Sequence, residues 1–599
     1  MDTRFPITLP AGVVRNDSAY AVKGRYINSS FVHFWEGKPQ KWGGWGNYFN
    51  LAFTEPARGG VIWNANDGRT LSAFGTANKL WLMREGALYD ITPNGLTTGL
   101  VNSATADSGY GADGYGSGPY GGGWTAFAGQ GSFPRVWTVC KWGEDLVACP
   151  RGGPIYFWDY SAANLGRTMT GTTSNTSTTV SALTNDTAIV VGDRVTGTGI
   201  PVDTFVSSVN TVAHTMVISH AATASGTGVT LTFTSPAVAL STLTADAALP
   251  SVALGIFVTD DRELVAFGAA QSPQTYDALN IAWCDREDFT VWTPSDTNTA
   301  GAIRCETGNQ IMGAVRVFGG WLILTDLSAH PFTFQGGDDI WGLDRVGSTG
   351  GAIGPHAMVE VDGVAYWMGP NAIHSYNGRV NTVPCDVHEA VYNNINRLQA
   401  YKICAGTVRR YGLLIWFLPG TLTSLENDSY FGVNTFDSTW ELGGSLADTD
   451  DVPVAAFSRT TWIDSNALFK TPLGTDGSNY KIYQHEAGTT ADGVPIAYAL
   501  ETGEIELKAE GGSIQASDTF IRLKKVAPDW AYISGAHSLT IKARGYANDP
   551  EVEKGPYDMT GVMFNPKARG RSFRFLMTGT GDMRLGDMEA YGSPDGGRR

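Results

Sequence analysis

A short strand, turn, strand unit recurs along the chain and constrains its fold more than any other feature. Each unit has a polar or glycine turn, an apolar run and an aromatic second strand, as in GTANKLWLMREGALYDIT from Gly75 and VDGVAYWMGPNAIHSYNG from Val361. The units recur about every 50 residues once two insertions are set aside. This spacing is typical of a β-propeller, in which each small sheet buries both faces against its neighbours. We therefore predict an all-β propeller with six or seven blades; a pair of β-sandwiches with evenly spaced hairpins is the alternative.

The first insertion is SGYGADGYGSGPYGGG from Ser108, a Gly- and Tyr-rich tract of low complexity. Such composition predicts a loop without regular structure. If the loop projects into a channel, its tyrosines are candidate contact residues. They are Tyr110, Tyr115 and Tyr120.

The second insertion, residues 168–235, is rich in Thr, Ser and Val and carries few charges. Its segments alternate β-branched and polar residues between Gly and Asn turns, which is the pattern of short strands. We therefore predict an inserted small β-domain.

Beyond Gly488 the repeat stops, and segments such as HSLTIKARGY and RGRSFRFLMTG alternate polar and apolar residues. This pattern predicts a separate C-terminal β-sandwich. Its expected core residues are Leu507, Ile521, Leu523, Leu539, Ile541, Phe573 and Phe575.

These boundaries divide the chain into four parts. Residues 1–50 are a docking or blade-closing segment, 51–167 and 236–488 form the propeller, 168–235 form the inserted domain and 489–599 form the sandwich.

One segment breaks the β pattern. In DVHEAVYNNINRLQAYKICAG, Asp386 and Glu389 have the spacing of a capping box, which predicts an amphipathic helix. The residues expected to share its apolar face are Val387, Val391, Ile395 and Leu398.

Charge narrows the classes of function. The formal net charge is −16, and residues 501–599 carry as many acidic as basic side chains, so the deficit lies in residues 1–500. An acidic surface argues against a protein that grips nucleic acid, because that affinity comes from Lys and Arg. The sequence shows neither a signal peptide nor an apolar run long enough to span a membrane, and its six dilute cysteines indicate reduced thiols.

No catalytic constellation stands out. The chain has no G-x-S-x-G nucleophile elbow, no phosphate-binding P-loop and no H-E-x-x-H helix, and its nine histidines are scattered. We therefore predict no catalytic residue, no cofactor, no metal ion and no enzymatic activity.

A basic cluster near the C-terminus is a candidate surface for an acidic partner. It consists of Lys567, Arg569, Arg571 and Arg574. The alternative is a solvated strand face whose charges are balanced by nearby carboxylates.

Three stretches carry a resemblance to a known family. The first is LPAGVVRNDSAYAVKGRYINSSFVHFWEGKPQKWGGW from Leu9. The middle one consists of GNQIMGAVRVFGGWLILTDLSAHPFTFQGG from Gly308, GGAIGPHAMVEVDGVAYWMGPNAIHSYNG from Gly350 and the helix after Asp386. The last is RGRSFRFLMTGTGDMRLGDMEAYGSPDGGRR from Arg569. They resemble the tail tubular, nozzle-type proteins of short-tailed bacteriophages, also described as tail tubular protein B-like, packaged-DNA stabilisation or tail-hub proteins. The likeness covers most of residues 1–160 and 250–599, whereas residues 168–235 depart from it.

The resemblance implies a structural virion protein of the bacteriophage tail tube, made in the bacterial host cytoplasm. A homohexameric ring would form the nozzle of the head-tail connector complex, with the portal and adaptor assembly and tail fibres or spikes as partners. Genomic double-stranded DNA would be retained and then pass during ejection. An acidic channel would repel its phosphates and permit only transient, non-specific contact.

Two other functions remain open on the residues alone. A carbohydrate-binding or glycan-degrading β-propeller would use the abundant Trp and Tyr faces to stack on sugars. A receptor-binding tail adhesin would use the inserted β-domain to read its receptor.

Overall fold

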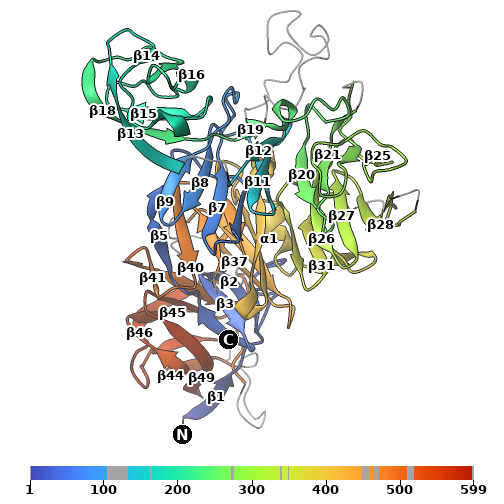
Figure 1. The fold of residues 1–599 in the computed structure, drawn as a ribbon. Helices are drawn as coiled ribbons and strands as arrows, with labels where there is room; N and C mark the ends of the chain where they lie inside the picture. Colours follow the sequence, from blue (N-terminus) through green and yellow to red (C-terminus); the bar gives the residue numbers. More distant parts are fainter. Residues whose placement is uncertain are drawn as a thin grey trace, which may run out of the picture. The chain divides into compact units, whose positions relative to one another are not determined.

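The computed structural model describes residues 2–103, 133–161, 165–271, 275–337, 340–347, 350–447, 457–464, 471–508 and 519–595. Nearly all of its regular structure is antiparallel strand (Figure 1). The chain divides into two compact units, which are described one at a time. The first unit is Met1–Ala52, Val315–Phe318 and Ala352–Arg599, and the second is Phe53–Ala314 and Gly319–Gly351.

The second unit holds four four-stranded antiparallel sheets that follow one another along the chain, except that the end of β26 is assigned to the first unit. Their strands are β6 (Gly60–Asn64), β7 (Thr70–Gly75), β8 (Leu80–Arg84) and β9 (Ala87–Asp90); β10 (Trp137–Trp142), β11 (Asp145–Pro150), β12 (Tyr156–Trp158) and β19 (Val238–Ala239); β20 (Gly255–Val258), β21 (Leu264–Phe267), β24 (Asn280–Trp283) and β25 (Gly301–Arg304); and β26 (Ile311–Val317), β27 (Gly320–Thr325), β28 (Ala329–Phe334) and β29 (Trp341–Leu343).

The first unit holds three further sheets of this kind. Their strands are β30 (Met358–Val361), β31 (Val364–Met368), β32 (Ile373–Tyr376) and β33 (Val380–Val383); β34 (Cys404–Val408), β35 (Leu413–Leu418), β36 (Ser429–Asn434) and β37 (Trp440–Gly444); and β38 (Thr461–Ile463), β39 (Leu473–Thr475), β40 (Lys481–His485) and β5 (Trp45–Ala52). Two short strands, β41 (Thr490–Ala491) and β42 (Val494–Pro495), extend the last sheet beyond β5.

The sheets pack as propeller blades do. Within the second unit the first strands β6, β10 and β20 lie against one another, and within the first unit β30, β34 and β38 do the same. A middle strand such as β35, LLIWFL, is buried at all six positions, because a blade is covered on both faces. The predicted β-propeller is therefore confirmed, with seven such sheets in the described part of the chain, and a pair of sandwiches is excluded for this region.

The C-terminal β-sandwich is also confirmed, and N-terminal strands contribute to both of its sheets. One sheet contains β3 (Val32–Trp35), β4 (Lys38–Lys41), β49 (Met583–Pro594), β44 (Ile521–Ile533) and β47 (Ala568–Gly570), with β1 (Thr3–Ile7) paired to β49. The other contains β2 (Tyr26–Ser30), β43 (Tyr498–Thr502), β48 (Ser572–Gly579), β45 (His537–Arg544) and β46 (Val552–Asp558). All seven core residues that the alternation predicts are buried.

The inserted β-domain folds around a small apolar core of its own, as predicted. Its two three-stranded sheets contain β13 (Leu165–Thr173), β18 (Gly226–Thr234) and β15 (Arg194–Gly197), and β14 (Thr179–Val180), β17 (Thr215–Ile218) and β16 (Val206–Asn210). In chain order the domain leaves the second sheet after β12 and returns as β19, the fourth strand of the same sheet. It forms the teal and green lobe in Figure 1.

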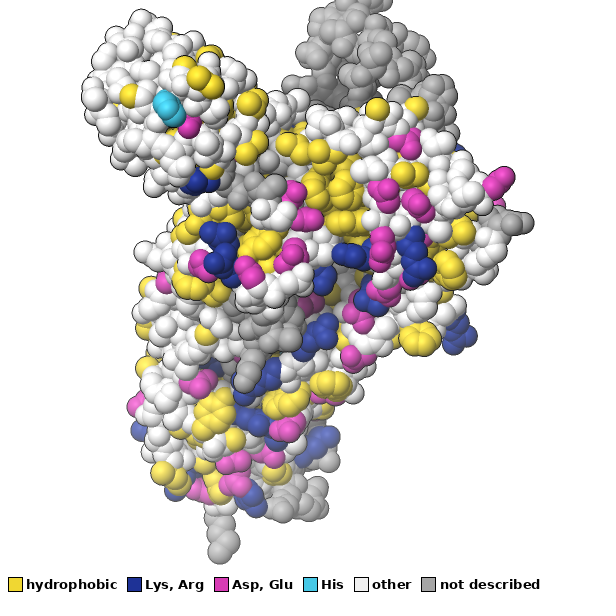
Figure 2. All heavy atoms as spheres, viewed as in Figure 1, with side chains coloured by type: hydrophobic (Ala, Val, Ile, Leu, Met, Phe, Trp, Pro, Cys, Tyr) yellow, Lys and Arg dark blue, Asp and Glu magenta, His cyan; other side chains and the backbone are white. Residues whose placement is uncertain are grey.

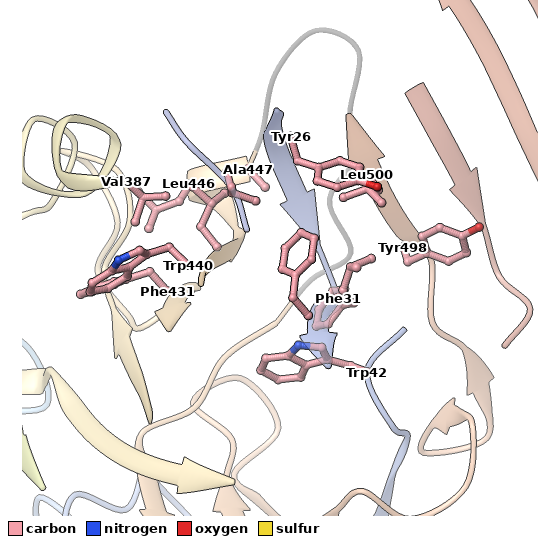
Figure 3. Packing of buried hydrophobic residues seen from close by; sticks show 14 of the residues in the cluster. Tyr26, Phe31, Trp42, Val387, Phe431, Trp440, Leu446, Ala447, Tyr498 and Leu500 are labelled. Carbon is pink, nitrogen blue, oxygen red and sulfur yellow. The ribbon is translucent and has the colours of Figure 1, made fainter. Parts of the chain in front are cut away.

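Aromatic side chains from the N-terminal segment are central to the core of the first unit. The ring centroids of Phe31 and Trp42 lie 6.0 Å apart (Figure 3). The ring of Phe31 also lies 5.9 Å from that of Tyr430, and the Tyr430 hydroxyl accepts a hydrogen bond from the Phe31 backbone N–H. Replacing such a buried Phe with Ala destabilises a protein by about 3 to 5 kcal/mol.

The predicted helix is shorter than the sequence indicates. α1 covers His388–Tyr392, its N-cap is Val387, and a 3₁₀ helix follows at Arg397–Lys402. The predicted capping box is wrong. The Glu389 backbone N–H, which the capping box would pair with the Asp386 side chain, donates instead to the Asn16 side chain of the N-terminal segment at 3.1 Å. The Asn396 side chain begins the second helix, which turns Leu398 outward to 56% exposure.

Among the described residues, no helix is both long and apolar enough to cross a bilayer. The six cysteines are free thiols, as predicted, and four of them are buried.

Candidate functional site

A pocket in the second unit lies where the inserted β-domain meets the β12 and β19 edge of the second sheet. Its volume is about 360 Å³. Figure 2 shows hydrophobic side chains gathered over this part of the surface. The lining residues are Asn94, 157–159, 190–193, 235–239, Thr242 and Leu243.

The base of the pocket is fixed by the chain that returns from the inserted domain. β19 pairs with β12 through Val238 and Phe157, and the Trp158 indole N–H donates to the Ser235 carbonyl at 3.1 Å. The Ala237 N–H donates to the Ile91 carbonyl at 2.8 Å, which anchors the same segment to the first sheet. Residues 235–239 therefore cannot move without breaking backbone pairing.

The opposite wall is the loop 190–193 of the inserted domain. Asp193 is buried; its carboxylate accepts the Val190 N–H at 3.1 Å and the Ser235 hydroxyl at 2.7 Å. Gly192 has φ +99°, a left-handed conformation that favours glycine, and its carbonyl accepts the Asn94 amide at 3.0 Å. The loop is thus held both to its own domain and to the segment after β9.

A four-residue charge network holds the inserted domain against the first sheet. Lys79 Nζ lies 3.0 Å from Asp90 and 2.8 Å from Asp203, and Arg194 Nη1 lies 2.7 Å from Asp203. Arg194 also donates from Nη2 to the Thr92 carbonyl at 3.1 Å. Hydrogen bonds from Lys79 and Arg194 lower the pKa of Asp203, which favours its charged form.

The pocket combines apolar walls with a few acidic and amide groups. Val190, Val191 and Leu243 are exposed on its walls, whereas Asp159 and Asn94 supply a carboxylate and an amide. Of the described residues that line it, none is Lys, Arg or His. This chemistry suits an uncharged ligand with apolar faces and hydroxyl groups.

A pair of carboxyl groups lies on the inner strands of the first unit. Glu360 is in β30 and Asp464 follows β38, on the two strands that pack beside β34. The Thr407 N–H donates to Asp464 at 2.6 Å. Burial raises the pKa of Asp464 and the charge of Glu360 adds to that effect, against the opposing influence of Thr407 and Arg409.

Two further acids are buried in the first unit near the N-terminal segment. Glu441 is 2% exposed and accepts the Trp42 indole N–H at 3.1 Å, and burial raises its pKa well above the ordinary value. Burial also raises the pKa of Glu486, to about 7. Glu441 is too enclosed to meet a substrate, so we assign this pair to packing.

The residues predicted from sequence do not gather at the pocket. Tyr110, Tyr115 and Tyr120 lie outside the described residues. In the basic cluster, Lys567 and Arg569 are exposed, Arg569 donates to Asp595 at 2.8 Å and Arg571 lies over Tyr546. Arg574 is largely buried and donates to Glu551 at 2.8 Å. A partner-facing role for this cluster stays a prediction.

No family model matches the chain, and no curated protein matches it. Solved structures with a similar arrangement of strands include YCF48 bound to D1 peptide, at 8% identity over 73% of this chain and 93% of that chain, with a TM-score of 0.32. An α-L-arabinanase of Penicillium chrysogenum is 9% identical over 67% of this chain and 99% of that chain, with a TM-score of 0.26. An exo-β-1,3-galactanase of Phanerochaete chrysosporium is 10% identical over 92% of this chain and 100% of that chain, with a TM-score of 0.22.

These comparisons contradict the expectation of a nozzle subunit, since they return propeller proteins and glycoside hydrolases rather than tail proteins. The expectation that the chain has no enzymatic activity is corrected on the same finding. The resemblance to the tail family, the ring and its partners, and the virion location stay predictions. Since the TM-scores of these structures are below 0.5, what the chain binds has to be argued from its own residues.

Proposed function

We propose that this protein recognises glycans, and that the pocket beside the inserted β-domain holds one or two sugar rings. The observation that supports the proposal is the lining of the pocket, in which apolar walls stand next to carboxylate and amide groups. Small-molecule sites have this composition, with a few placed polar groups that fix the orientation of the ligand.

A sugar ring matches both parts of the lining. Its C–H faces can pack on Val190, Val191 and Leu243, which removes apolar surface from water. Its hydroxyl groups can donate to the carboxylate of Asp159 and accept from the amide of Asn94. The volume of 360 Å³ lies at the lower end of the range for ligand pockets, which favours one or two rings over a longer chain.

A pair of exposed valines in the inserted domain gives a matched test. Val191 lines the pocket and is 61% exposed, whereas Val212 is 91% exposed and is not among the lining residues. Val191→Trp should fill part of the pocket without disturbing a core, and should weaken binding at least about tenfold. Val212→Trp adds the same side chain elsewhere and should bind like the parent protein.

The measurement is a glycan array with the full chain, followed by calorimetric titration of the best ligand. Loss of binding in Val191→Trp alone supports the proposal. Equal loss in both variants, or a parent protein that binds no glycan, overturns it.

The carboxyl pair on the inner strands supports a second candidate function, glycoside hydrolysis. Cleavage of a glycosidic bond uses two carboxyl groups, one of which is kept protonated by a raised pKa to act as the acid. The raised pKa of Asp464, to which burial contributes most and the charge of Glu360 adds, fits that division of roles. Asp464 would protonate the leaving oxygen, and Glu360 would act as base or nucleophile.

Release of reducing sugar from the glycans that bind tests this second function. Asp464→Asn and Glu360→Gln should each lower kcat by about 10²-fold or more, since each removes a proton-transfer or nucleophilic group. Asp587→Asn, an exposed acid of the sandwich, is the control and should keep full activity. A parent protein with no turnover, or an Asp464→Asn variant with unchanged kcat, rules this function out.

A further inference from the structure

Exposed alkyl side chains line the pocket on two sides. Val190 and Val191 are exposed on the loop of the inserted domain. Val238 on β19 and Leu243, a few residues further along the chain, are exposed on the other side. A ligand that covers these side chains removes apolar surface from water, which favours its binding.

The polar groups of the loop are bonded within the protein. Asp193 is buried, and its two carboxylate oxygens accept the Val190 N–H at 3.1 Å and the Ser235 hydroxyl at 2.7 Å. The Gly192 N–H donates to the Val206 carbonyl at 2.8 Å. These groups hold the loop in place and are not the ones that a ligand meets.

The polar groups on the other side are engaged in the same way. The Thr242 hydroxyl donates to the Ala239 carbonyl at 2.7 Å, and the Leu243 N–H donates to the Leu240 carbonyl at 2.9 Å. β19 itself is paired with β12. Both sides therefore meet a ligand mainly through alkyl groups.

Asn94 supplies a polar contact within this lining. Its side-chain amide donates to the Gly192 carbonyl at 3.0 Å. An Asn side chain has a second N–H and a carbonyl oxygen, so Asn94 can bind a sugar hydroxyl while it keeps its bond to the loop.

We propose that the pocket selects 6-deoxyhexoses, sugars in which a methyl group replaces the C6 hydroxymethyl group, an inference that rests on the proposed glycan recognition. The methyl group would pack on the valine and leucine side chains, and a ring hydroxyl would bond to Asn94. The C6 hydroxyl of an ordinary hexose, held against the same side chains, would lose water and gain no hydrogen-bond partner from them. The two effects together should favour the deoxy sugar about tenfold.

Matched pairs of sugars test this selection on the unmodified protein. The methyl glycosides of L-fucose and L-galactose differ only in the C6 hydroxyl, as do those of L-rhamnose and L-mannose. Calorimetric titration of the full chain should show the deoxy member binding about tenfold more tightly in at least one pair. Its heat-capacity change on binding should be the more negative of the two, because it buries more apolar surface.

Val191→Thr locates the effect in the pocket. Thr keeps the branched shape of Val and replaces one methyl group with a hydroxyl that can bond to the C6 hydroxyl. The variant should narrow the ratio of the two affinities about threefold. Val212→Thr makes the same exchange at an exposed position outside the lining and should leave the ratio unchanged. Thermal unfolding of each variant checks that it is folded.

The outcomes separate the two proposals. If the hydroxylated member binds as tightly as the deoxy member in both pairs, or if only glycans without such a methyl group bind, the selection is wrong while glycan recognition stands. If no glycan binds at all, the proposed function fails and the selection fails with it. If Val191→Thr changes the ratio no more than Val212→Thr does, the selection does not come from the pocket and the inference is overturned.

Discussion

At the scale of single residues, Glu486 shows how a buried acid links stability to pH. It follows β40, and burial raises its pKa to about 7 from an ordinary value of 4.5. The folded protein therefore prefers the protonated form at pH values where an unfolded chain is ionised. Sequence inspection could not find this group, because the residues that hydrogen-bond to it, Gly43 and Tyr411, are distant in the chain.

The stability of the first unit should fall as the pH rises. Because the folded pKa of Glu486 is above its unfolded value, its stabilising contribution is complete below about pH 4.5 and is lost through about pH 7. Glu486→Gln cannot ionise. The difference in free energy of unfolding between this variant and the parent should therefore be about 1 to 3 kcal/mol more favourable to the variant at pH 8 than at pH 4.5. Urea unfolding at the two pH values measures the difference.

The control for this prediction is Glu553→Gln, an exposed acid on β46. It should change stability equally at both pH values. A Glu486→Gln variant whose stability follows the parent across this range contradicts the assignment of the raised pKa.

Residue patterns predicted buried positions well in strands, where the alternation of apolar residues matches the alternation of buried positions. All seven predicted core residues of the sandwich are buried, because a strand with one covered face buries every second residue. Leu398 is different: its place on the predicted helix face depended on an unbroken helix, and the chain stops the helix at Asn393. A cap from Asn16, over 370 residues away, leaves no local signal.

At the scale of elements, the charge network is the clamp between the inserted domain and the first sheet. Arg194→Ala would remove a largely buried cation that lies 3.7 Å from Asp90 and 2.7 Å from Asp203. Loop 190–193, which forms one wall of the pocket, should then become more mobile. We expect glycan affinity to fall about tenfold and amide exchange in residues 190–197 to accelerate.

Arg304→Ala is the matched control, because Arg304 is also paired with an acid of the same unit, Asp277, and is more than half exposed. It should change neither affinity nor exchange at the loop, as exposed ion pairs contribute little. Unchanged exchange in Arg194→Ala would show that the clamp does not depend on this network.

The pocket could not be predicted from elements alone. Its lining comes from four separate segments, and no one of them carries a motif. The strands of the inserted domain were predictable from the alternation of β-branched and polar residues. Its position against β9 depends on side chains such as Lys79, which the sequence does not distinguish from other surface charges. The one local sign is the turn VVGD at Val190, where two apolar residues precede a left-handed glycine.

At the scale of the whole molecule, the inserted domain is separable in topology. Leu165 and Thr234 face each other as paired residues at the base of β13 and β18, so the two ends of the domain are adjacent. Replacing the residues between them with an Asn-Gly turn should leave the blade sheets folded. The variant should keep a cooperative thermal transition and lose glycan binding, because loop 190–193 is absent.

Circular dichroism and calorimetric titration measure the two parts of that prediction. A variant that retains binding would place the glycan site outside the pocket. A variant that does not fold would show that the sheet containing β12 and β19 depends on the inserted domain.

The N-terminal strands have partners near the opposite end of the chain, with β1 on β49, β2 on β43 and β5 on β40. During translation, β5 emerges about 430 residues before β40, and at about 5 to 20 residues per second it waits about 20 to 90 s for its partner. Apolar strand edges are exposed for that time, so chaperone binding to the nascent chain is the expected safeguard. Ribosome-bound chains that stop before residue 480 should leave residues 2–52 open to protease, and completed chains should protect them.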